Sequence, residues 1–231
     1  MFSLKLPKFI SLLCVMNVSW TVFGAQPEHQ GSVLPQFNVL SAYAEGVQGI
    51  VPVMLAKEIE TRTEKSLVEL FDVVGGAGSG SVLVAALACG MSADDVVQFF
   101  EEKSALIFSS DNKSPEGIYD YDVLKRELFG LFGNRILSTA QCVLYIVVLD
   151  RETNQPVVLS SNGLGKDRLI SDVCAISMAH PSLFIATDPQ YMSAANVLGN
   201  PVGAIYDYVS EQFPGRDVKL VDFSTMESLS E

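Results

Sequence analysis

The sequence predicts an α/β fold in which helices cover both faces of a mostly parallel sheet. Segments with strand and helix character alternate along most of the chain. The strand candidates are apolar on both faces, as in the run 142–149 (CVLYIVVL), which is typical of strands buried between two helical layers. In addition, a glycine-rich turn at 75–81 joins one strand directly to an apolar helix, as in α/β sheets that bind ligands.

Composition and charge exclude several classes of protein. Apolar residues make up 48% of the 231 positions and charged residues 18%, so the chain has enough apolar surface for a core and is not disordered. Acidic residues outnumber basic ones 27 to 15, which gives a formal net charge of −12. Such a surface repels phosphate backbones, and no basic stripe occurs, so we expect no nucleic-acid partner. No cluster with metal-ligand spacing is present either, so we expect no metal site.

Residues 1–25 have the layout of a secretory signal peptide. Lys5 and Lys8 precede an almost uncharged apolar run at 9–23, and small residues suited to cleavage follow it. This layout predicts an exported protein, either secreted or periplasmic. The alternative is an uncleaved signal anchor that tethers the protein to a membrane, because Phe23 fits poorly three residues before the cut.

After this leader we expect a linker, one domain and a tail, at 26–36, 37–225 and 226–231. Short apolar and β-branched runs predict five strands, at 37–42, 71–74, 142–149, 157–159 and 218–223. Apolar residues at helical spacing predict six helices, at 50–63, 82–89, 93–103, 123–132, 172–178 and 202–212. Two signals refine this assignment. Ser92 and Asp95 form a capping pattern before one helix, and the turn 152–156 joins two strands as a hairpin.

The junction at 73–81 is where such a fold positions chemistry, because N–H groups at a helix start face a bound anion. A phosphate-binding loop needs a lysine after its last glycine, but Ser81 follows Gly80. A dinucleotide fingerprint needs a third glycine where Ser81 stands, so a nucleotide-dependent redox protein is a weak alternative and we expect no cofactor. A nucleophile elbow, in which glycines flank a strained serine, is the third interpretation.

Three segments carry the motifs of one known family. Residues 71–92 (FDVVGGAGSGSVLVAALACGMS) are similar to F-D-x-I-x-G-T-S-T-G-G, an apolar helix and G-M-S. Residues 39–52 (VLSAYAEGVQGIVP) are similar to V-L-S-x-D-G-G-G-x-R-G-x-x-P, and 191–201 (YMSAANVLGNP) to D-G-G-x-x-x-N-N-P. In these motifs the chain resembles the patatin-like phospholipases, and the resemblance covers about residues 37–224. It implies a three-layer α/β/α fold and lipid acyl hydrolysis by a Ser–Asp dyad, with glycine N–H groups as the oxyanion hole.

The catalytic positions of the family carry other residues here. Gly78 stands at the nucleophile position, and glycine has no atom that attacks an ester. Ser193 stands at the position of the dyad aspartate. In the oxyanion loop, residues 43–45 (Tyr-Ala-Glu) replace Asp-Gly-Gly and Gln48 replaces Arg, and a carboxylate at this point would repel a developing oxyanion. The retained glycines are Gly46 and Gly49 in the oxyanion loop and Gly76 and Gly80 at the elbow.

The sequence therefore predicts a secreted, catalytically inactive patatin-like protein. It would act by binding a lipid or fatty acyl ligand, or as the hetero-partner of an active patatin-like protein. The alternative is an active lipid acyl hydrolase, a phospholipase or esterase, with Ser79 as a shifted nucleophile and His180 or Asp188 as its base. The competing structural roles are a helix N-terminal hydrogen bond for Ser79 and a helix C-terminal cap for His180.

Overall fold

The computed structural model describes residues 36–225 except 117, 196 and 199. The expected signal peptide (1–25), the tail (226–231) and nearly all of the linker lie outside the described residues, so these assignments stay predictions. Gln36, assigned above to the linker, is the first residue of a strand.

A six-stranded mixed sheet forms the centre of the described chain, with strand order β4-β3-β2-β1-β6 and β5 beside β3. Neighbouring strands along β3-β2-β1-β6 are parallel, whereas β4 and β5 each pair with β3 in antiparallel orientation. The strands are β1 (Gln36–Ala44), β2 (Val73–Gly78), β3 (Val143–Asp150), β4 (Pro156–Ser160), β5 (Tyr191–Met192) and β6 (Asp217–Ser224). The expected hairpin is therefore confirmed as β3 and β4.

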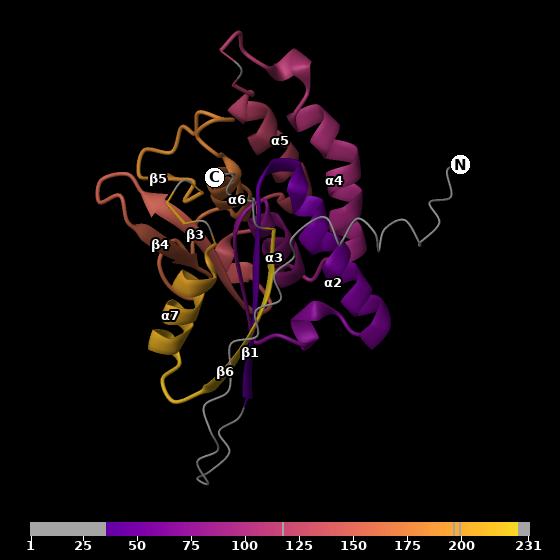
Figure 1. The fold of residues 1–231 in the computed structure, drawn as a ribbon, viewed down its shortest axis with the longest axis vertical. Coiled ribbons are helices and arrows are strands. Elements are labelled where there is room, and N and C mark those ends of the chain that lie inside the picture. The colour runs from indigo at the N-terminus through magenta and orange to yellow at the C-terminus, as the bar shows by residue number, and fades with distance from the viewer. Residues whose placement is uncertain (1–35, 117, 196, 199, 226–231) are drawn as a thin grey trace, which may run out of the picture.

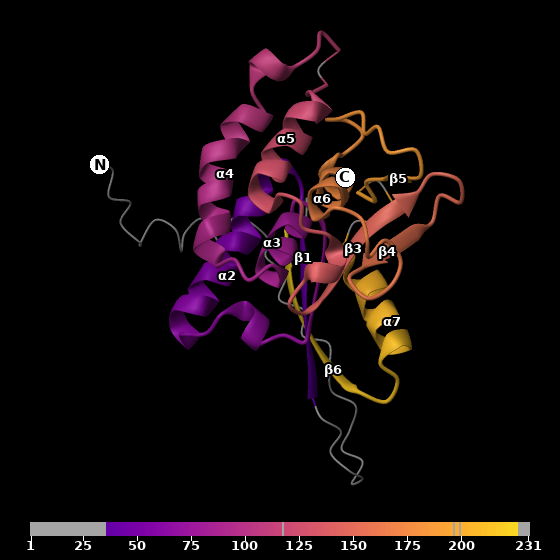
Figure 2. The same cartoon turned by 180° about the vertical axis from the view of Figure 1, so that it is seen from behind.

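Helices cover both faces of this sheet (Figures 1 and 2). On one face α3 and α6 lie against the central strands, and α2, α4 and α5 pack beside them; α7 covers the opposite face. The helices are α2 (Ile50–Thr63), α3 (Gly80–Ala88), α4 (Ala93–Ile107), α5 (Tyr121–Phe132), α6 (Ile170–Met178) and α7 (Val202–Gln212). A separate apolar core fills each interface. The predicted α/β/α architecture with a mostly parallel sheet is thus confirmed.

The strand before the glycine-rich turn differs from its prediction. We expected it to end at residue 74, but β2 continues through the glycines to Gly78, and α3 begins at Gly80. The reason is position: β2 lies between β1 and β3, and both neighbours bond its backbone whatever its side chains are. The short strand β5 was not predicted, because two residues carry no periodic signal.

The capping pattern predicted before α4 is present in the structure. Ser92 Oγ accepts the Asp95 N–H at 3.2 Å, and the Asp95 carboxylate accepts the Ser92 N–H at 2.8 Å, which confirms the capping box of α4. Within the ranges that the structure describes, no helix is long and apolar enough to cross a membrane. The same residues contain no group of three or more His, Cys, Asp or Glu side chains arranged to hold a metal ion.

Two neighbouring glycines of β2 should differ in their tolerance of alanine. A Cβ on Gly76 would lie 2.8 Å from the Ala42 carbonyl oxygen, in the backbone of the adjacent strand; one on Gly75 would lie 2.9 Å from Ile205 Cδ1, a movable side-chain end. We expect Gly76→Ala to lower the free energy of unfolding by about 3 kcal/mol and Gly75→Ala by about 1 kcal/mol, measured by chemical denaturation. Equal losses would contradict this account of the elbow.

Candidate functional site

The turn between β2 and α3 has the backbone shape of a nucleophile elbow. Gly78 is the last residue of β2 and pairs in register with Ala44 at the end of β1. Its φ is +58°, in the left-handed region that strongly favours glycine. A nucleophile elbow holds its serine in such a strained turn above the sheet, so Gly78 occupies the apex where the attacking side chain would stand.

The end of β1 fills the space around this apex. The backbone N–H of Ser79 donates to the carbonyl oxygen of Ala44 at 2.8 Å. In an elbow, the residue after the nucleophile supplies an oxyanion-hole N–H, so this donor is already engaged by the chain itself. A Cβ added to Gly78 would overlap the same Ala44 oxygen. One carbonyl therefore blocks both the place of a nucleophilic side chain and a donor for the oxyanion.

Ser177 in α6 connects the two positions at which the family carries its dyad. Its Oγ accepts the Gly78 N–H at 3.1 Å and donates to the Val147 carbonyl at 3.0 Å. Its own carbonyl accepts the Ser193 hydroxyl at 2.8 Å. The structure thus brings Gly78 and Ser193 together, as a dyad requires, but the buried Ser193 hydroxyl donates to a carbonyl and is no base. Sequence reasoning missed Ser177, because no local pattern marks it.

Ser79, the fallback nucleophile, points into the protein. Its side chain is fully buried, and its Oγ has no hydrogen-bond partner among the described residues. A Cβ on Gly49 would lie 2.7 Å from this oxygen, so the hydroxyl faces the oxyanion loop from inside. The hydrogen bond that we expected from Ser79 to the start of α3 is absent, because the Ser79 backbone is already helical (φ −71°, ψ −16°), whereas a capping residue is extended. A hydroxyl without a bonded base is a weak nucleophile.

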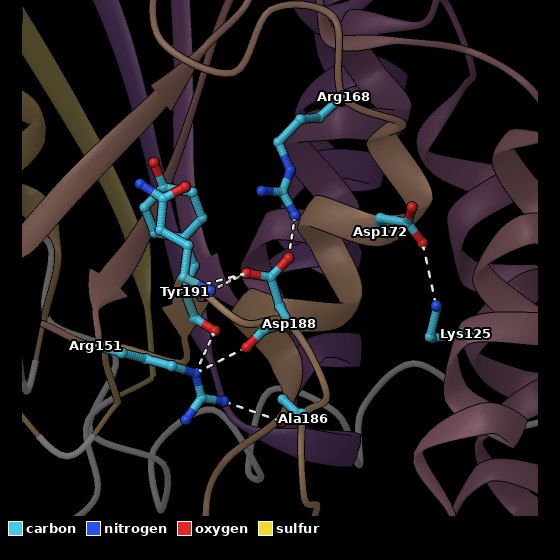
Figure 3. Close-up of polar contacts among 8 residues, drawn as sticks. Lys125, Arg151, Arg168, Asp172, Ala186, Asp188 and Tyr191 are labelled. Carbon is cyan, nitrogen blue, oxygen red and sulfur yellow. Dashed lines mark hydrogen bonds and ion pairs between the residues drawn. The ribbon is translucent and has the colours of Figure 1, made fainter.

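Asp188, one candidate base for Ser79, is engaged in a different contact (Figure 3). Its carboxylate pairs with Arg168 and accepts the backbone N–H groups of Gln190 and Tyr191 at 3.0 and 2.7 Å. Burial alone would raise the pKa of this carboxyl, but these hydrogen bonds and the Arg168 charge lower it. Arg151 binds the backbone carbonyls of the same loop, at Ala186, Asp188 and Tyr191. Asp188 therefore fixes the loop that leads to Ser193.

His180, the other candidate base, faces Glu45. The distance from His180 Nε2 to Glu45 Oε2 is 3.8 Å, and the other Glu45 oxygen accepts the Tyr43 hydroxyl. The predicted capping of α6 by the His180 side chain is wrong, because its Nδ1 bonds Ser182 instead. Glu45 thus places a carboxylate directly after Ala44, beside the elbow, where the family's oxyanion loop carries glycine.

The retained glycines mark close approaches between elements. A Cβ on Gly49 would lie 2.6 Å from the Phe100 ring, and one on Gly80 would lie 2.8 Å from Tyr43 Cα. Gly76 faces Ala42 as described above, whereas a Cβ on Gly46 would meet Phe108 only at an ordinary 3.5 Å, and this glycine instead takes a left-handed φ of +50° in the turn after Glu45. Gly49, Gly76 and Gly80 therefore keep β1, the oxyanion loop and α3 in contact, a role that survives without catalysis.

A left-handed apex between a buried strand and an apolar helix, at the carboxyl edge of a mostly parallel sheet, defines an α/β protein of the nucleophile-elbow class. The family described as patatin-like phospholipase matches residues 46–207. The chain belongs to this family, which confirms the resemblance seen in the sequence.

Named relatives share this family. The chain is 28% identical to Patatin-T5 of Solanum tuberosum over 165 residues, and 27% identical to a potato protein named "Probable inactive patatin-3-Kuras 1" over 190 residues. These matches cover 64% and 74% of the chain, and 43% and 49% of the relatives, so the chain spans about half their length. Among solved structures, VipD from Legionella pneumophila aligns with a TM-score of 0.44 and 14% identity, over 72% of this chain and 47% of VipD.

Restoring the missing serine should not restore the site. In Gly78→Ser the new Cβ would overlap the Ala44 carbonyl and take a left-handed φ, so we expect the free energy of unfolding to fall by at least about 2 kcal/mol. Gly203→Ser in α7 is the matched control, because a Cβ there meets nothing within 4 Å; we expect a change within about 0.5 kcal/mol. Thermal or chemical denaturation measures both, and a stable Gly78→Ser protein would contradict the blocked elbow.

The Asp188 contacts should make stability depend on pH. Because the pKa of the carboxyl is lower in the folded chain, its contribution is present above the unfolded-state value of about 4 and is lost as pH falls through the folded-state value. We expect Asp188→Asn to cost about 2 kcal/mol at pH 7, since hydrogen bonds to a charged group are lost, and less below pH 4. Denaturation at several pH values, with the exposed Asp207→Asn as control, checks this; a difference that stays constant with pH would contradict it.

Proposed function

We propose that this protein is a catalytically inactive member of its family and acts by binding, as the partner of an active patatin-like protein. The observation that carries the proposal is the Ser79 N–H to Ala44 carbonyl hydrogen bond at an elbow whose apex is glycine. Loss of a nucleophile alone costs about 10⁶-fold in rate, and the residual activity depends on an open oxyanion hole. Here one donor of such a hole, the Ser79 N–H, is bonded to the chain itself.

The outer surface beside the elbow favours a protein partner over an acyl chain held inside. Tyr43, Ser79 and Phe100 bury their side chains around the elbow, which leaves recognition to exposed residues. Ile185 and Val47 are 70% and 52% exposed. Ile185 follows Phe184 in sequence, and Val47 follows Gly46, which lies beside the Phe108 ring that packs on Phe184. Exposed apolar groups of this kind are common in contact surfaces between proteins. A lipid or fatty acyl ligand is the second class of binding partner.

Two further points support the proposal. The name of one potato relative contains the words "probable inactive", so inactivity has been ascribed within the family. The leader at 1–25 predicts export, secreted or periplasmic, and an exported active relative would be the natural partner; a membrane-tethered form is the alternative.

The absence of lipid hydrolysis is the first test. Purified protein incubated with phosphatidylcholine vesicles should release no more fatty acid than buffer, because glycine stands at the apex of the elbow and the Ser79 N–H is bonded to Ala44. The alternative, a hydrolase that uses Ser79, predicts release that Ser79→Ala abolishes. Hydrolysis by the wild type that Ser79→Ala removes would overturn the proposal in favour of that alternative.

Partnering is tested with an active patatin-like protein from the same organism. We expect the two to associate in analytical ultracentrifugation or a pull-down, and Val47→Asp with Ile185→Asp to weaken the association at least tenfold. Leu164→Asp is the matched control, because Leu164 is also 52% exposed but lies between β4 and α6. Binding of a fluorescent fatty acid with no protein association would favour the acyl ligand instead.

A further inference from the structure

A second group of polar side chains lies beside the elbow. Two of its members, His180 and Ser182, stand outside the family motifs. His180 Nδ1 is 2.7 Å from Ser182 Oγ, and His180 Nε2 is 3.8 Å from Glu45 Oε2. The Tyr43 hydroxyl in turn bonds the second oxygen of Glu45. The imidazole and the carboxylate are each about four-fifths buried, whereas Ser182 is exposed. A serine, an imidazole and a carboxylate thus follow one another in space.

The backbone fixes the direction of this chain of contacts. The Ser182 N–H donates to His180 Nδ1 at 3.1 Å, so this nitrogen presents its lone pair to Ser182. The neutral ring then carries its proton on Nε2, toward Glu45. With Nδ1 as the acceptor, the Ser182 hydroxyl also donates to it and shares its one lone pair with the Ser182 N–H. This is an arrangement in which imidazole can act as a general base for an alcohol.

Glu45 completes the arrangement by its charge. When the ring takes the serine proton, it becomes an imidazolium whose Nε2–H faces a carboxylate at ion-pair distance. The Tyr43 hydroxyl holds that carboxylate in place. Glu45, which stands where the family's oxyanion loop carries glycine, thus lies where it would face the imidazolium formed in this step.

We propose that Ser182 is a nucleophilic acyl-acceptor site, with His180 as its general base and Glu45 as the residue that positions and stabilises the imidazolium. Its substrates are small activated acyl or phosphonyl esters, which can reach Ser182 because this residue is exposed. The step is covalent modification of Ser182 and does not depend on the elbow or on the proposed function.

The bonds of this step balance without a cofactor. With an aryl ester, Ser182 Oγ attacks the carbonyl carbon while its proton moves to His180 Nδ1. The tetrahedral intermediate expels the aryl oxide, which takes the proton from Nδ1, and the products are acyl-Ser182 and the phenol. With a fluorophosphonate, the new bond is Oγ–P, the P–F bond breaks, and the proton and fluoride leave to solvent.

The test is labelling of the full folded chain with a fluorophosphonate, read by intact mass and peptide mapping. We expect one equivalent on Ser182, and none on Ser182→Ala. His180→Ala should slow labelling about 10²-fold, the usual contribution of a general base, and added imidazole should recover part of the rate. Glu45→Gln should slow it by a smaller factor. Imidazole rescue is diagnostic, because a purely structural role for His180 would not respond to it.

An internal control uses a second exposed serine. Ser92 Oγ contacts the Asp95 carboxylate and no imidazole, so it should stay unlabelled in the same digest. The proposal is overturned if Ser182 stays unlabelled, if His180→Ala labels at the wild-type rate, or if Ser92 labels equally fast. Labelling at Ser79 would instead overturn the inactive elbow, so the two ideas fail separately.

Discussion

The hydrogen bond from the Ser79 N–H to the Ala44 carbonyl is the contact on which the rest of the site depends. It joins the carboxyl end of β1 to the first turn of α3. The backbone of β1 approaches the β2–α3 junction this closely only because residues 76, 78 and 80 are glycines. The bond satisfies two backbone groups that would otherwise be buried and unpaired. The same bond removes the space in which an acyl hydrolase holds its nucleophile and its oxyanion. Stability at this junction and catalysis at it are therefore in competition.

The polar side chains around the elbow form hydrogen bonds and ion pairs that stabilise the fold. Ser177 accepts the Gly78 N–H and receives the Ser193 hydroxyl at its carbonyl, so the two dyad positions are joined by a structural link in α6. Asp188 neutralises Arg168 and organises the loop before Ser193. A site that turns over substrate keeps unsatisfied groups for the transition state. Here the Gly78 and Ser79 N–H groups and the Ser81 and Ser193 hydroxyls all bond the protein itself, whereas the buried Ser79 hydroxyl has no partner among the described residues.

The sequence predicted the architecture well and the site only in part. Elements with a regular period, such as α2 at 50–63 and α7 at 202–212, were placed at their observed bounds, because local pattern suffices for an amphipathic or apolar helix. Gly78 and Ser193 were identified from motif alignment. What failed was long-range: the course of β2 through its glycines, the Ser177 link and the Glu45–His180 contact. The Gly78–Ser177 bond spans 99 positions, and no local pattern encodes a contact of that separation.

Glu45 brings a negative charge to the place beside the elbow where the family's oxyanion loop carries glycine. An oxyanion loop needs N–H donors and no nearby negative charge, yet Glu45 follows immediately after Ala44. A lone carboxylate there would be costly when partly buried, and His180 and Tyr43 offset that cost from two sides. The carboxylate also lies at ion-pair distance from His180 Nε2, on the far side of the ring from Ser182. The residue that works against an oxyanion at Gly78 is therefore the one that completes the Ser182–His180–Glu45 arrangement outside the elbow.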